Sequence, residues 1–294
     1  PMGGYLESLS VFGEPKDGAR FGELTALHVQ QADQRIQLRL GTYGGQKWQL
    51  TLDRTPHLFS TTGMSAFQSA GLGVFTLPDP LQTTLNTIVA TPPLDTAAFG
   101  AALNGAASPT ALSVQQRTTT LTWSRNANPG LTYSASYSAE NRSGSRPIGT
   151  TFYLGSQNEL PEPVFHRTRE LTASVEYSGD RGAGCLEVRR SRFTNQVPSL
   201  TWDNPLQLVD GVGGSSQGRM ALDPSNDASD VSLSGAVHVA DGAILSGVFS
   251  RGRWEQNAPF LPFTINSALA PPALPAPSLG GRIDTSLESL NLDL

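Results

Sequence analysis

The chain has little cysteine and little lysine. Cys185 is the one cysteine in 294 residues, so an intrachain disulfide, a CxxCH haem-attachment motif and a zinc site built from several cysteines are excluded for these residues. A lone cysteine in a strand is expected to be a small buried or lipid-facing hydrophobe. Of the 20 basic residues, only Lys16 and Lys47 are lysines. Because soluble sheets often blunt their edge strands with lysine, this scarcity favours a closed or lipid-covered sheet.

Charge of either sign is also scarce. Charged residues make up 15% of the chain and the formal net charge is −5. No basic patch is evident that would neutralise phosphates, so nucleic acid is not an expected partner. No run of about eighteen apolar residues occurs, which excludes a transmembrane helix. The start, Pro-Met-Gly-Gly-Tyr, lacks the basic and then apolar pattern of a signal peptide. Both ends look cut, so we expect an internal piece of a longer protein.

The chain does contain a repeated alternation of apolar and small polar residues. Leu131–Ser138 reads Leu-Thr-Tyr-Ser-Ala-Ser-Tyr-Ser, and Leu171–Ser178 reads Leu-Thr-Ala-Ser-Val-Glu-Tyr-Ser. Side chains alternate between the two faces of a strand, so one face carries Leu, Ala, Val and Tyr while the other carries Ser, Thr and one Glu. An apolar face with aromatic residues near its ends, backed by a mostly uncharged polar face, is typical of a transmembrane barrel strand.

The same rhythm, bounded by turn residues, predicts eleven strands. They are Tyr5–Phe12, Gly22–Gln30, Gln34–Gly41, Lys47–Arg54, Gln115–Arg125, Leu131–Asn141, Arg167–Ser178, Cys185–Thr194, Ser229–Val239, Ala243–Gly252 and Asp284–Leu294. Tight polar turns at Asn126–Gly130 and Ser178–Gly182 alternate with long loops, as in outer-membrane barrels. The expected fold is all-β, an antiparallel transmembrane β-barrel with long loops. We expect residues 1–294 to form a single partial domain, with about 11–13 strands of a larger barrel.

Two segments depart from the strand rhythm. Residues 55–116 carry few charges, and we expect weak strands near Gly71–Leu77 and Leu85–Ala90 followed by a short helix over Leu94–Leu103. This low-charge region is expected to fold into the lumen or over the rim of the barrel. Residues 257–281 contain six prolines and are expected to form a long loop, because proline removes the donors that a central strand needs.

Motifs that carry chemistry are few. Gly214-Ser215-Ser216-Gln217-Gly218 matches G-x-S-x-G, but a nucleophile elbow needs a strand before it and a helix after it, so a Gly/Ser loop is the favoured interpretation. The four histidines show no HExxH spacing: His28, His57, His166 and His238. Asp223–Asp230 offers oxygen ligands for Ca²⁺ but lacks the EF-hand glycine and glutamate, and a polar turn explains it without a metal. We therefore expect no enzyme and no catalytic, cofactor-binding or metal-binding residues.

Three arginines lie close together on one expected strand. Arg190 and Arg192 share an alternation face with Leu186 and Val188, so the apolar face ends there, while Arg189 is on the other face. One interpretation is a strand end that enters the headgroup zone or the lumen, where arginine snorkels or pairs with carboxylates. The other interpretation is that lumenal arginines pair with acidic groups of a protein threaded through the barrel.

Six loop motifs in order along Arg142–Ser286 have no explanation in strand periodicity. They are Arg142-Ser-Gly-Ser-Arg-Pro-Ile-Gly149; Leu160-Pro-Glu-Pro163 with Arg167-Thr-Arg-Glu170 and Glu176-Tyr-Ser-Gly-Asp-Arg181; Ser199-Leu-Thr-Trp-Asp-Asn-Pro-Leu206; Asp223-Pro-Ser-Asn226; Asn257-Ala-Pro-Phe-Leu-Pro-Phe-Thr-Ile-Asn266; and Leu274–Ser286, which ends Gly-Arg-Ile-Asp-Thr-Ser. In this series the chain resembles the MtrB/PioB family of outer-membrane barrels associated with decahaem cytochromes, and it would be roughly the N-terminal half of a member. The N-terminal CxxC of some members is lacking.

The resemblance implies a role without catalysis in the bacterial outer membrane. The barrel would sheathe a periplasmic decahaem c-type cytochrome in its lumen, so that electrons cross the outer membrane; the haem would belong to the partner, and this chain would carry no cofactor. An extracellular multihaem cytochrome is a second candidate partner, and outer-membrane lipid would surround the barrel. Two alternatives stay open. A diffusion porin or transporter needs no haem partner, and a secreted soluble β-sandwich or adhesin would bury its apolar faces against each other.

Overall fold

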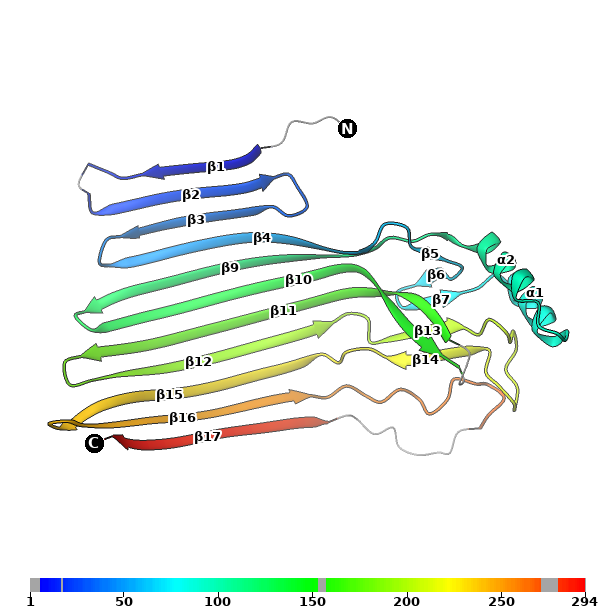
Figure 1. Ribbon diagram of the computed structural model, residues 1–294. Coiled ribbons are helices and arrows are strands. Elements are labelled where there is room, and N and C mark those ends of the chain that lie inside the picture. The colour runs from blue at the N-terminus through cyan, green and yellow to red at the C-terminus, as the bar shows by residue number, and fades with distance from the viewer. Residues whose placement is uncertain (1–5, 17, 153–156, 271–279, 294) are drawn as a thin grey trace.

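A computed structural model describes residues 6–16, 18–152, 157–270 and 280–293. Its main feature is one antiparallel sheet of eleven strands that follow one another in chain order (Figure 1). These strands are β1 (Leu6–Gly13), β2 (Arg20–Val29), β3 (Arg35–Thr42), β4 (Gln46–Ser60), β9 (Leu112–Asn128), β10 (Leu131–Thr151), β11 (Gln157–Gly179), β12 (Gly182–Asn195), β15 (Asn226–Ala240), β16 (Ala243–Gln256) and β17 (Gly281–Asp293). All eleven expected strands are present. Tyr5 and Leu294, at the ends of two of them, lie outside the described residues.

The central strands are longer than a bilayer requires. β10 has 21 residues and β11 has 23, whereas a tilted transmembrane strand needs about 9–11. The two strands pair without a break from Leu131 opposite Tyr177 to Thr151 opposite Gln157. The sequence pattern located only one half of this hairpin, because apolar alternation ends near Asn141 and arginine, glycine and proline follow. The second half of the hairpin continues beyond the apolar part of the sheet.

The two ends of the strands form different rims (Figure 1). At one rim the connections are tight, with two residues between β9 and β10, between β11 and β12, and between β15 and β16. Gly130 makes the first of these turns with a positive φ of 82°, and its carbonyl accepts from the Ser178 amide at 2.7 Å. At the other rim, long connections follow β4, β12 and β16. Short turns on one rim and long loops on the other match the outer-membrane pattern.

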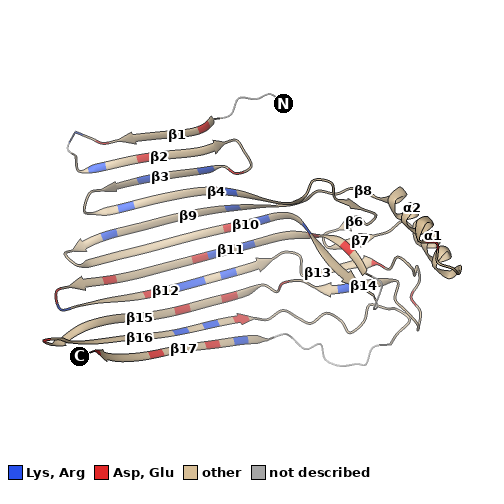
Figure 2. Ribbon diagram, in the orientation of Figure 1, with Lys and Arg blue, Asp and Glu red and all other residues tan. Residues whose placement is uncertain are grey.

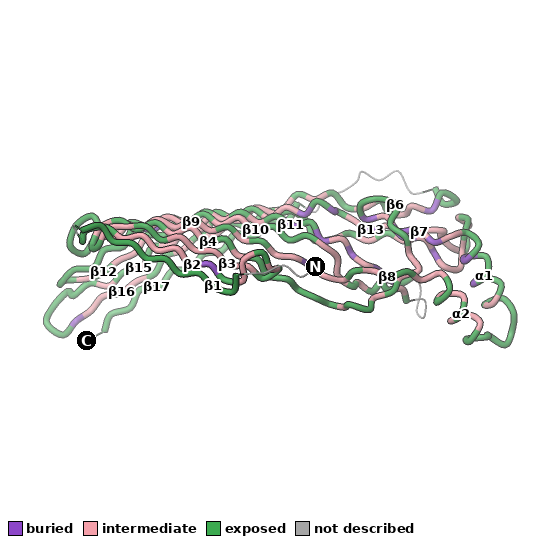
Figure 3. Tube along the Cα trace, turned by 90° about the horizontal axis from the view of Figure 1, so that it is seen from above, coloured by how far each residue is buried: buried purple, intermediate pink, exposed green. Residues whose placement is uncertain are grey.

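The sheet is curved, and its apolar face is the outer one. Along β11, Leu171 is 52% exposed and Val175 is 37% exposed, whereas Ser174 is only 8% exposed. Residues directly opposite each other in a ladder point to the same face, so the strand register carries this pattern across the sheet. Seen from above, the middle strands lie to one side and both edges curve towards the other (Figure 3). The hydroxyl-bearing face therefore lines the hollow of an open arch.

Apolar side chains form a continuous band across the convex face. Trp48 and Trp123, opposite each other on β4 and β9, have ring centroids 6.1 Å apart. A soluble sheet would cover such a band with a second layer, but many of its large apolar residues stay exposed, among them Trp48, Leu121 and Leu171. The convex band is the lipid-facing surface of the barrel. One register line of this band consists of Leu38, Leu50, Leu121, Tyr137 and Leu171.

The segment between β4 and β9 contains two helices beyond the long-loop rim (Figure 1). The expected strand at Leu85–Ala90 is wrong: these residues belong to α1 (Asp79–Ala90), which begins after Pro78 and buries Leu81, Gln82 and Leu85 on one helical face. The expected helix is present as α2 (Thr96–Ala106), where Asp95 Oδ1 caps the Ala98 amide at 2.9 Å. Of the described helices, neither has the length and apolar character to cross a membrane.

Short strands and helices pack together beyond the long-loop rim as a cap, residues 61–111 and 196–225. Besides α1 and α2, the cap contains β5 (Met64–Ser65), β6 (Gln68–Gly71), β7 (Val74–Thr76), β8 (Ser108–Pro109), β13 (Ser199–Asp203) and β14 (Gln217–Ala221). β6 and β7 divide the expected Gly71–Leu77 strand at a turn. One cluster joins Phe75, Leu200 and Trp202 to Leu160 of β11, so the cap packs against the extended β10–β11 hairpin.

The expected proline-rich loop, 257–281, is only partly described. Residues 257–270 contain no strand, as the prolines predict, and residues 271–279 lie outside the described part of the chain. Gly281, its last expected residue, already belongs to β17. The described part returns to the cap, where Asn266 Nδ2 donates to the carbonyls of Gly211 and Gly214, both at 2.9 Å.

Candidate functional site: the concave face and its cap

Hydroxyl side chains of neighbouring strands meet on the concave face. Ser134 Oγ on β10 lies 2.7 Å from Ser174 Oγ on β11. Thr120 Oγ1 on β9 lies 3.3 Å from Ser138 Oγ on β10. The register places these residues between outward-pointing apolar neighbours, which is why each hydroxyl reaches the next strand on the inner side. The hydroxyl groups thus bond to one another, and the middle of the concave face is polar with few charges, of which Glu170 and Glu187 lie directly opposite Ser138 and Ser174.

Arginines on the concave face have carboxylate partners on the same face. Arg189 Nε donates to both oxygens of Asp230, each at 3.1 Å. Arg142 Nε lies 2.8 Å from Glu140 Oε1, and Gln116 Nε2 donates to the other oxygen of that carboxylate at 2.8 Å. Partly exposed pairs of this kind contribute only about 0–1 kcal/mol each. Their main effect is therefore to lower the net charge that the inner wall presents near the long-loop rim.

The three neighbouring arginines of β12 point to two different faces. Arg189 is on the concave face with Asp230, an internal partner. Arg190 and Arg192 are on the convex face, directly opposite Leu171 and Arg169 of β11. The first interpretation therefore accounts for all three residues, and pairing with a threaded protein stays a prediction. Arg190 and Arg192 end the lipid-facing band, and Arg189 belongs to the inner wall.

The acidic run Asp223–Asp230 is divided among separate partners. Asp230 bonds to Arg189, Asp227 lies 3.8 Å from Arg192 Nε, and Asp223 lies 3.8 Å from Arg146 Nη2. Asp227 and Asp230 also point to opposite faces of β15, because their positions differ by three residues. In the described ranges no group of three or more His, Cys, Asp or Glu is placed to hold a metal ion.

The G-x-S-x-G segment is a loop of the cap tied down by Asp210. Asp210 Oδ1 accepts from the amide and hydroxyl of Ser216, both at 2.8 Å, and Oδ2 accepts from the amide and hydroxyl of Ser267 at 2.6 and 2.8 Å. These four bonds hold the pKa of the Asp210 carboxyl well below its usual range, with the Ser267 amide as the largest cause. Gly214–Ser216 form a loop, strand β14 begins within the motif at Gln217, and no helix follows, so the loop interpretation is confirmed for the first three residues of the motif.

The histidines stay apart in the structure. His28 Nδ1 lies 2.9 Å from Asp33 Oδ2 near the β2–β3 connection. His166 packs its ring against Phe193, with centroids 5.1 Å apart. The remaining two, His57 and His238, are on β4 and β15.

Cys185 lies on the concave face of β12, half-buried, opposite Glu176 of β11 and Ser234 of β15. The expectation that Cys185 is a small buried or lipid-facing hydrophobe is wrong. The residue takes a position in the polar alternation rather than in the apolar one. A reagent that modifies this thiol therefore probes the inner side of the barrel wall.

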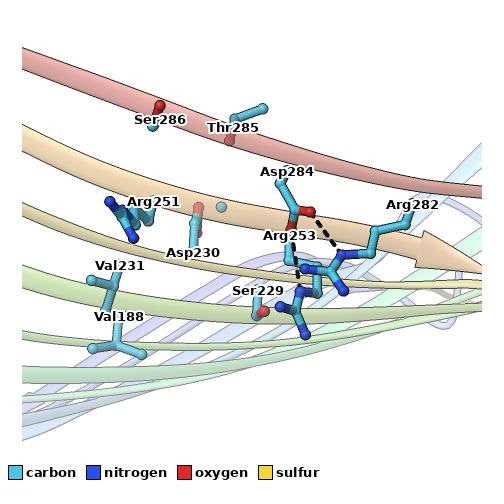
Figure 4. Close-up of a pocket in the computed structure, with 11 residues that line it drawn as sticks. Val188, Ser229, Asp230, Val231, Arg251, Arg253, Arg282, Asp284, Thr285 and Ser286 are labelled. Atoms are coloured by element: carbon cyan, nitrogen blue, oxygen red, sulfur yellow. Dashed lines mark hydrogen bonds and ion pairs between the residues drawn. The ribbon is translucent and has the colours of Figure 1, made fainter.

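A shallow depression of about 590 Å³ lies where β12, β15, β16 and β17 meet. Asp284 accepts from Arg282 at 2.7 Å and from Arg253 at 3.3 Å, and both arginines point to it (Figure 4). Arg251 Nη2, on the same wall, lies 3.9 Å from Glu288. The lining arginines Arg253 and Arg282 bond to the lining carboxylate of Asp284, so their charges offset one another. The residues that line the depression do not form a pair of nucleophile and base.

Three of the loop motifs meet in space at the base of the cap. Arg146 of the first motif donates to Glu162 of the second, Nε to Oε2 at 2.6 Å and Nη2 to Oε1 at 2.9 Å. Asp223 of the fourth motif lies beside the same guanidinium. Asn195 ties this junction to the neighbouring strand, because its Nδ2 donates to the Asp223 carbonyl at 3.0 Å. The resemblance named these segments, but only the fold shows that they touch.

The third motif, Ser199–Leu206, fixes the inside of the cap. Asp203 Oδ2 accepts from the Leu77 amide at 2.9 Å. Asn204, 1% exposed, accepts from the Leu206 amide and donates to the Ser215 carbonyl. The sequence alone assigned no role to the buried polar residues in and around the cap, among them Glu162, Asn195, Asn204 and Asn266. Membership of a loop motif was the one available signal, and it covers Glu162, Asn204 and Asn266.

A family model described as "Putative outer membrane beta-barrel porin, MtrB/PioB" matches residues 11–293. The chain belongs to the MtrB/PioB family. The match begins within β1 and ends at the last residue of β17, so it includes the curved sheet and the cap. This MtrB/PioB chain is therefore part of an outer-membrane β-barrel, located in the bacterial outer membrane, and the soluble sandwich alternative is wrong.

Individual relatives are more distant. The chain is similar to "Outer membrane protein MtrB" of Shewanella baltica, with 29% identity over 120 residues that cover 40% of this chain and 17% of the relative. Among solved structures it is similar to outer-membrane expressed OmpT of Vibrio cholerae, with a TM-score of 0.36 and 9% identity, covering 97% of this chain and 78% of that one. It is also similar to the open form of the ferric-catecholate import receptor Fiu of E. coli K12, with a TM-score of 0.40 and 11% identity, covering 97% and 48%. The family match carries the assignment.

Proposed function

We propose that the full-length MtrB/PioB barrel sheathes a periplasmic multihaem c-type cytochrome in its lumen and insulates an electron path across the outer membrane. The observation that carries the proposal is the wall of mutually bonded hydroxyls on the concave side of β9, β10 and β11. Such a wall can hydrogen-bond to a protein surface. It also brings few fixed charges that would compete with haem propionates for their partners.

The physics of the membrane supports a sheath. Electrons cannot hop unaided across an apolar band roughly 25 Å tall, so a chain of haems must pass through a protein-lined hole. Barrels of about eight strands are filled by their own side chains, and a hole for a protein requires many more. The eleven described strands form an open arch in which β1 and β17 each pair with one neighbour. They are consistent with one portion of a wide barrel.

We propose further that this chain has no catalysis of its own. Ser216 donates to an acidic group and not to a histidine, and Cys185 faces the lumen between polar neighbours. The haem would belong to the partner, and this chain would hold no cofactor. The cap stands beyond the long-loop rim, which is extracellular in outer-membrane barrels. It is therefore the surface that an extracellular multihaem cytochrome would meet.

Co-purification tests the sheath directly. The full-length protein is extracted from outer membranes in an uncharged detergent, and the complex is examined for a haem-staining polypeptide in equal amount. In parallel, Cys185 is labelled with a maleimide that does not cross membranes, all other cysteines of the full-length chain being replaced. With the cytochrome present we expect Cys185 to be protected, and without it we expect rapid labelling.

A matched control separates protection from poor reagent access. Asp241 lies in the tight turn between β15 and β16, outside the lumen. In an Asp241→Cys, Cys185→Ser variant, labelling is expected to be the same with and without cytochrome. A barrel that carries no haem protein, labels fully at Cys185 in native membranes and passes small solutes freely is a diffusion porin, and the sheath proposal is then wrong.

A further inference from the structure

Arginines form a row along the long-loop edge of the lipid-facing band. In Figure 2, β4, β9, β11, β12 and β16 carry basic residues away from the tight turns, and β4 and β9 also carry one close to them. The strand register assigns to the convex face eight of them, which we name the arginine row: Arg54, Arg117, Arg167, Arg169, Arg190, Arg192, Arg251 and Arg253. All eight are exposed.

The row contains like charges directly opposite each other. Arg54 of β4 faces Arg117 of β9, and Arg169 of β11 faces Arg192 of β12. Like charges in these positions destabilise a sheet. On the convex side of β4, β9, β10, β11 and β12, the described residues between the tight turns and the row include no Asp or Glu. A concentration of guanidinium groups is thus maintained at this level, with no carboxylate of the same five strands on the convex face between it and the tight turns.

The row runs level with the membrane and not along the strand register. From β4 to β16 it steps towards the tight turns: Arg54, Arg117 and Arg167 share one register line, Arg169 and Arg192 the next, Arg190 and Arg253 the third, and Arg251 the fourth. Barrel strands tilt by about 35–45° from the barrel axis, so a level line crosses them at successively shifted positions. Arginine positions that shift in one direction from strand to strand are therefore what a flat membrane interface would require of tilted strands.

The opposite edge of the band has a different composition. Trp48, Trp123, Tyr133 and Tyr177 lie on the convex face towards the tight turns. On β11, the nine residues from Arg169 to Tyr177 extend about 27 Å, or on the order of 20 Å across the membrane at barrel tilt. The band therefore has an aromatic girdle at one interface and an arginine girdle at the other.

Ion pairing leaves several arginines of the row, from β4 to β12, available. Towards β17, Arg253 bonds to Asp284 and Arg251 pairs with Glu288, and Arg192 lies 3.8 Å from Asp227. Arg54, Arg117, Arg169 and Arg190 make no ion pair among the described residues. Guanidinium groups bind phosphate with two parallel hydrogen bonds, and long side chains reach the headgroup level from the edge of an apolar band.

We propose that the arginine row is a binding surface for the phosphate groups of anionic lipids in one leaflet of the outer membrane. Its position at the long-loop rim assigns it to the outer leaflet, because long loops are extracellular in such barrels. The lipid phosphates neutralise the opposed arginines and fix the depth of the barrel in the membrane. This inference depends on the outer-membrane location and not on a cytochrome partner.

Lipid titration of the full-length protein tests the proposal. The protein is freed of lipid in an uncharged detergent, and binding of a bisphosphorylated glycolipid is counted by native mass spectrometry, with its dephosphorylated form as the comparison. A variant with Arg167, Arg169, Arg190 and Arg192 all changed to Gln should bind at least tenfold more weakly, since each basic residue at an anionic surface contributes about fivefold. Without lipid, the same variant should be at least as heat-stable as the parent, because opposed charges are removed.

Two single variants serve as controls. Arg125→Gln removes an exposed arginine from the convex face of β9 at the tight-turn end, and Arg142→Gln removes one from the concave face. Both should bind the phosphorylated lipid as the parent does. The proposal is overturned if the fourfold variant binds unchanged, if Arg125→Gln loses as much, or if the dephosphorylated lipid binds equally. Complete competition by millimolar inorganic phosphate would identify a site for free anions and not for lipid.

Discussion

Arg146 and Glu162, directly opposite each other on β10 and β11, form a two-pronged ion pair where the hairpin leaves the apolar band. Glu162 is 1% exposed, whereas the Arg146 side chain keeps 40% of its surface in solvent. The pair is thus asymmetric. The buried Glu162 carboxylate has little contact with water and needs the Arg146 guanidinium to offset its charge, whereas Arg146 is partly solvated without Glu162. Since Asp223 also lies beside Arg146, this pair joins the hairpin to the cap, in addition to the hydrophobic cluster at Leu160.

Removing the base should therefore cost more than removing the acid. Arg146→Met leaves a buried carboxylate unpaired, and we expect the free energy of unfolding to fall by about 1–3 kcal/mol, less than for a fully buried pair because Arg146 is partly in water. Glu162→Gln leaves an arginine that solvent can reach and should cost about 1 kcal/mol or less. Urea unfolding of the full-length barrel measures both changes. Arg142→Met is the control, and the idea fails if it costs as much as Arg146→Met.

Gly144, two residues earlier in the same motif, is required by backbone geometry. Its φ of +140° is rarely open to other residues, and a Cβ there would collide with the Ser113 carbonyl of β9. Gly144→Ala should destabilise the barrel by about 1–3 kcal/mol. Gly149→Ala, in the same motif, meets nothing within 4 Å and should be nearly neutral. Equal unfolding midpoints for the two variants would contradict this account.

Asp210 gives the cap a defined dependence on pH. Its native pKa lies below the unfolded value of about 3.9, so its contribution to stability is present above that value and is lost as the pH falls through the native pKa. Below about pH 4 we expect the loop around Ser216 and the segment at Ser267 to exchange amide hydrogens faster relative to the intrinsic rate at the same pH. Asp210→Asn should show this faster exchange already at pH 7. Asp241→Asn, in a tight turn, should leave both segments protected.

The eleven strands could be predicted because each signal is local. In Leu131–Ser138 every second residue is apolar, and Gly130 marks the turn, so a window of ten residues contains the whole argument. The same local signal wrongly predicted a strand at Leu85–Ala90, which belongs to α1. Its Leu, Ile and Val suit a strand, whereas the helix is fixed by Pro80 in its first turn and by burial of Leu81 and Leu85 against other parts of the cap.

The cap junction and the arginine row could not be predicted, because both depend on register. Arg146 meets Glu162 only because the hairpin continues past the apolar pattern, and Asp223 arrives from a connection far along the chain. The row becomes visible only once the pairing of seven strands, from β4 to β16, is known. Alternation did place Arg190 with Leu186 on one face, which is as far as a single strand can indicate. The cap junction and the full row depend on contacts between residues far apart in the sequence, which only the folded chain shows.

The assignment of inner and outer faces can be tested at neighbouring residues in the middle of β9. Leu121 is 41% exposed on the convex face, midway between Arg117 and Arg125, and Thr120 points to the concave side near Ser138. A lysine on the lipid face near the bilayer midplane costs about 2–4 kcal/mol, so Leu121→Lys should lower the stability of the full-length barrel in bilayers by that amount. Thr120→Lys adds the same charge to a watery lumen and should cost about 1 kcal/mol or less. Urea titration in lipid vesicles measures the difference, and its reversal would mean that the hydroxyl face meets the lipid.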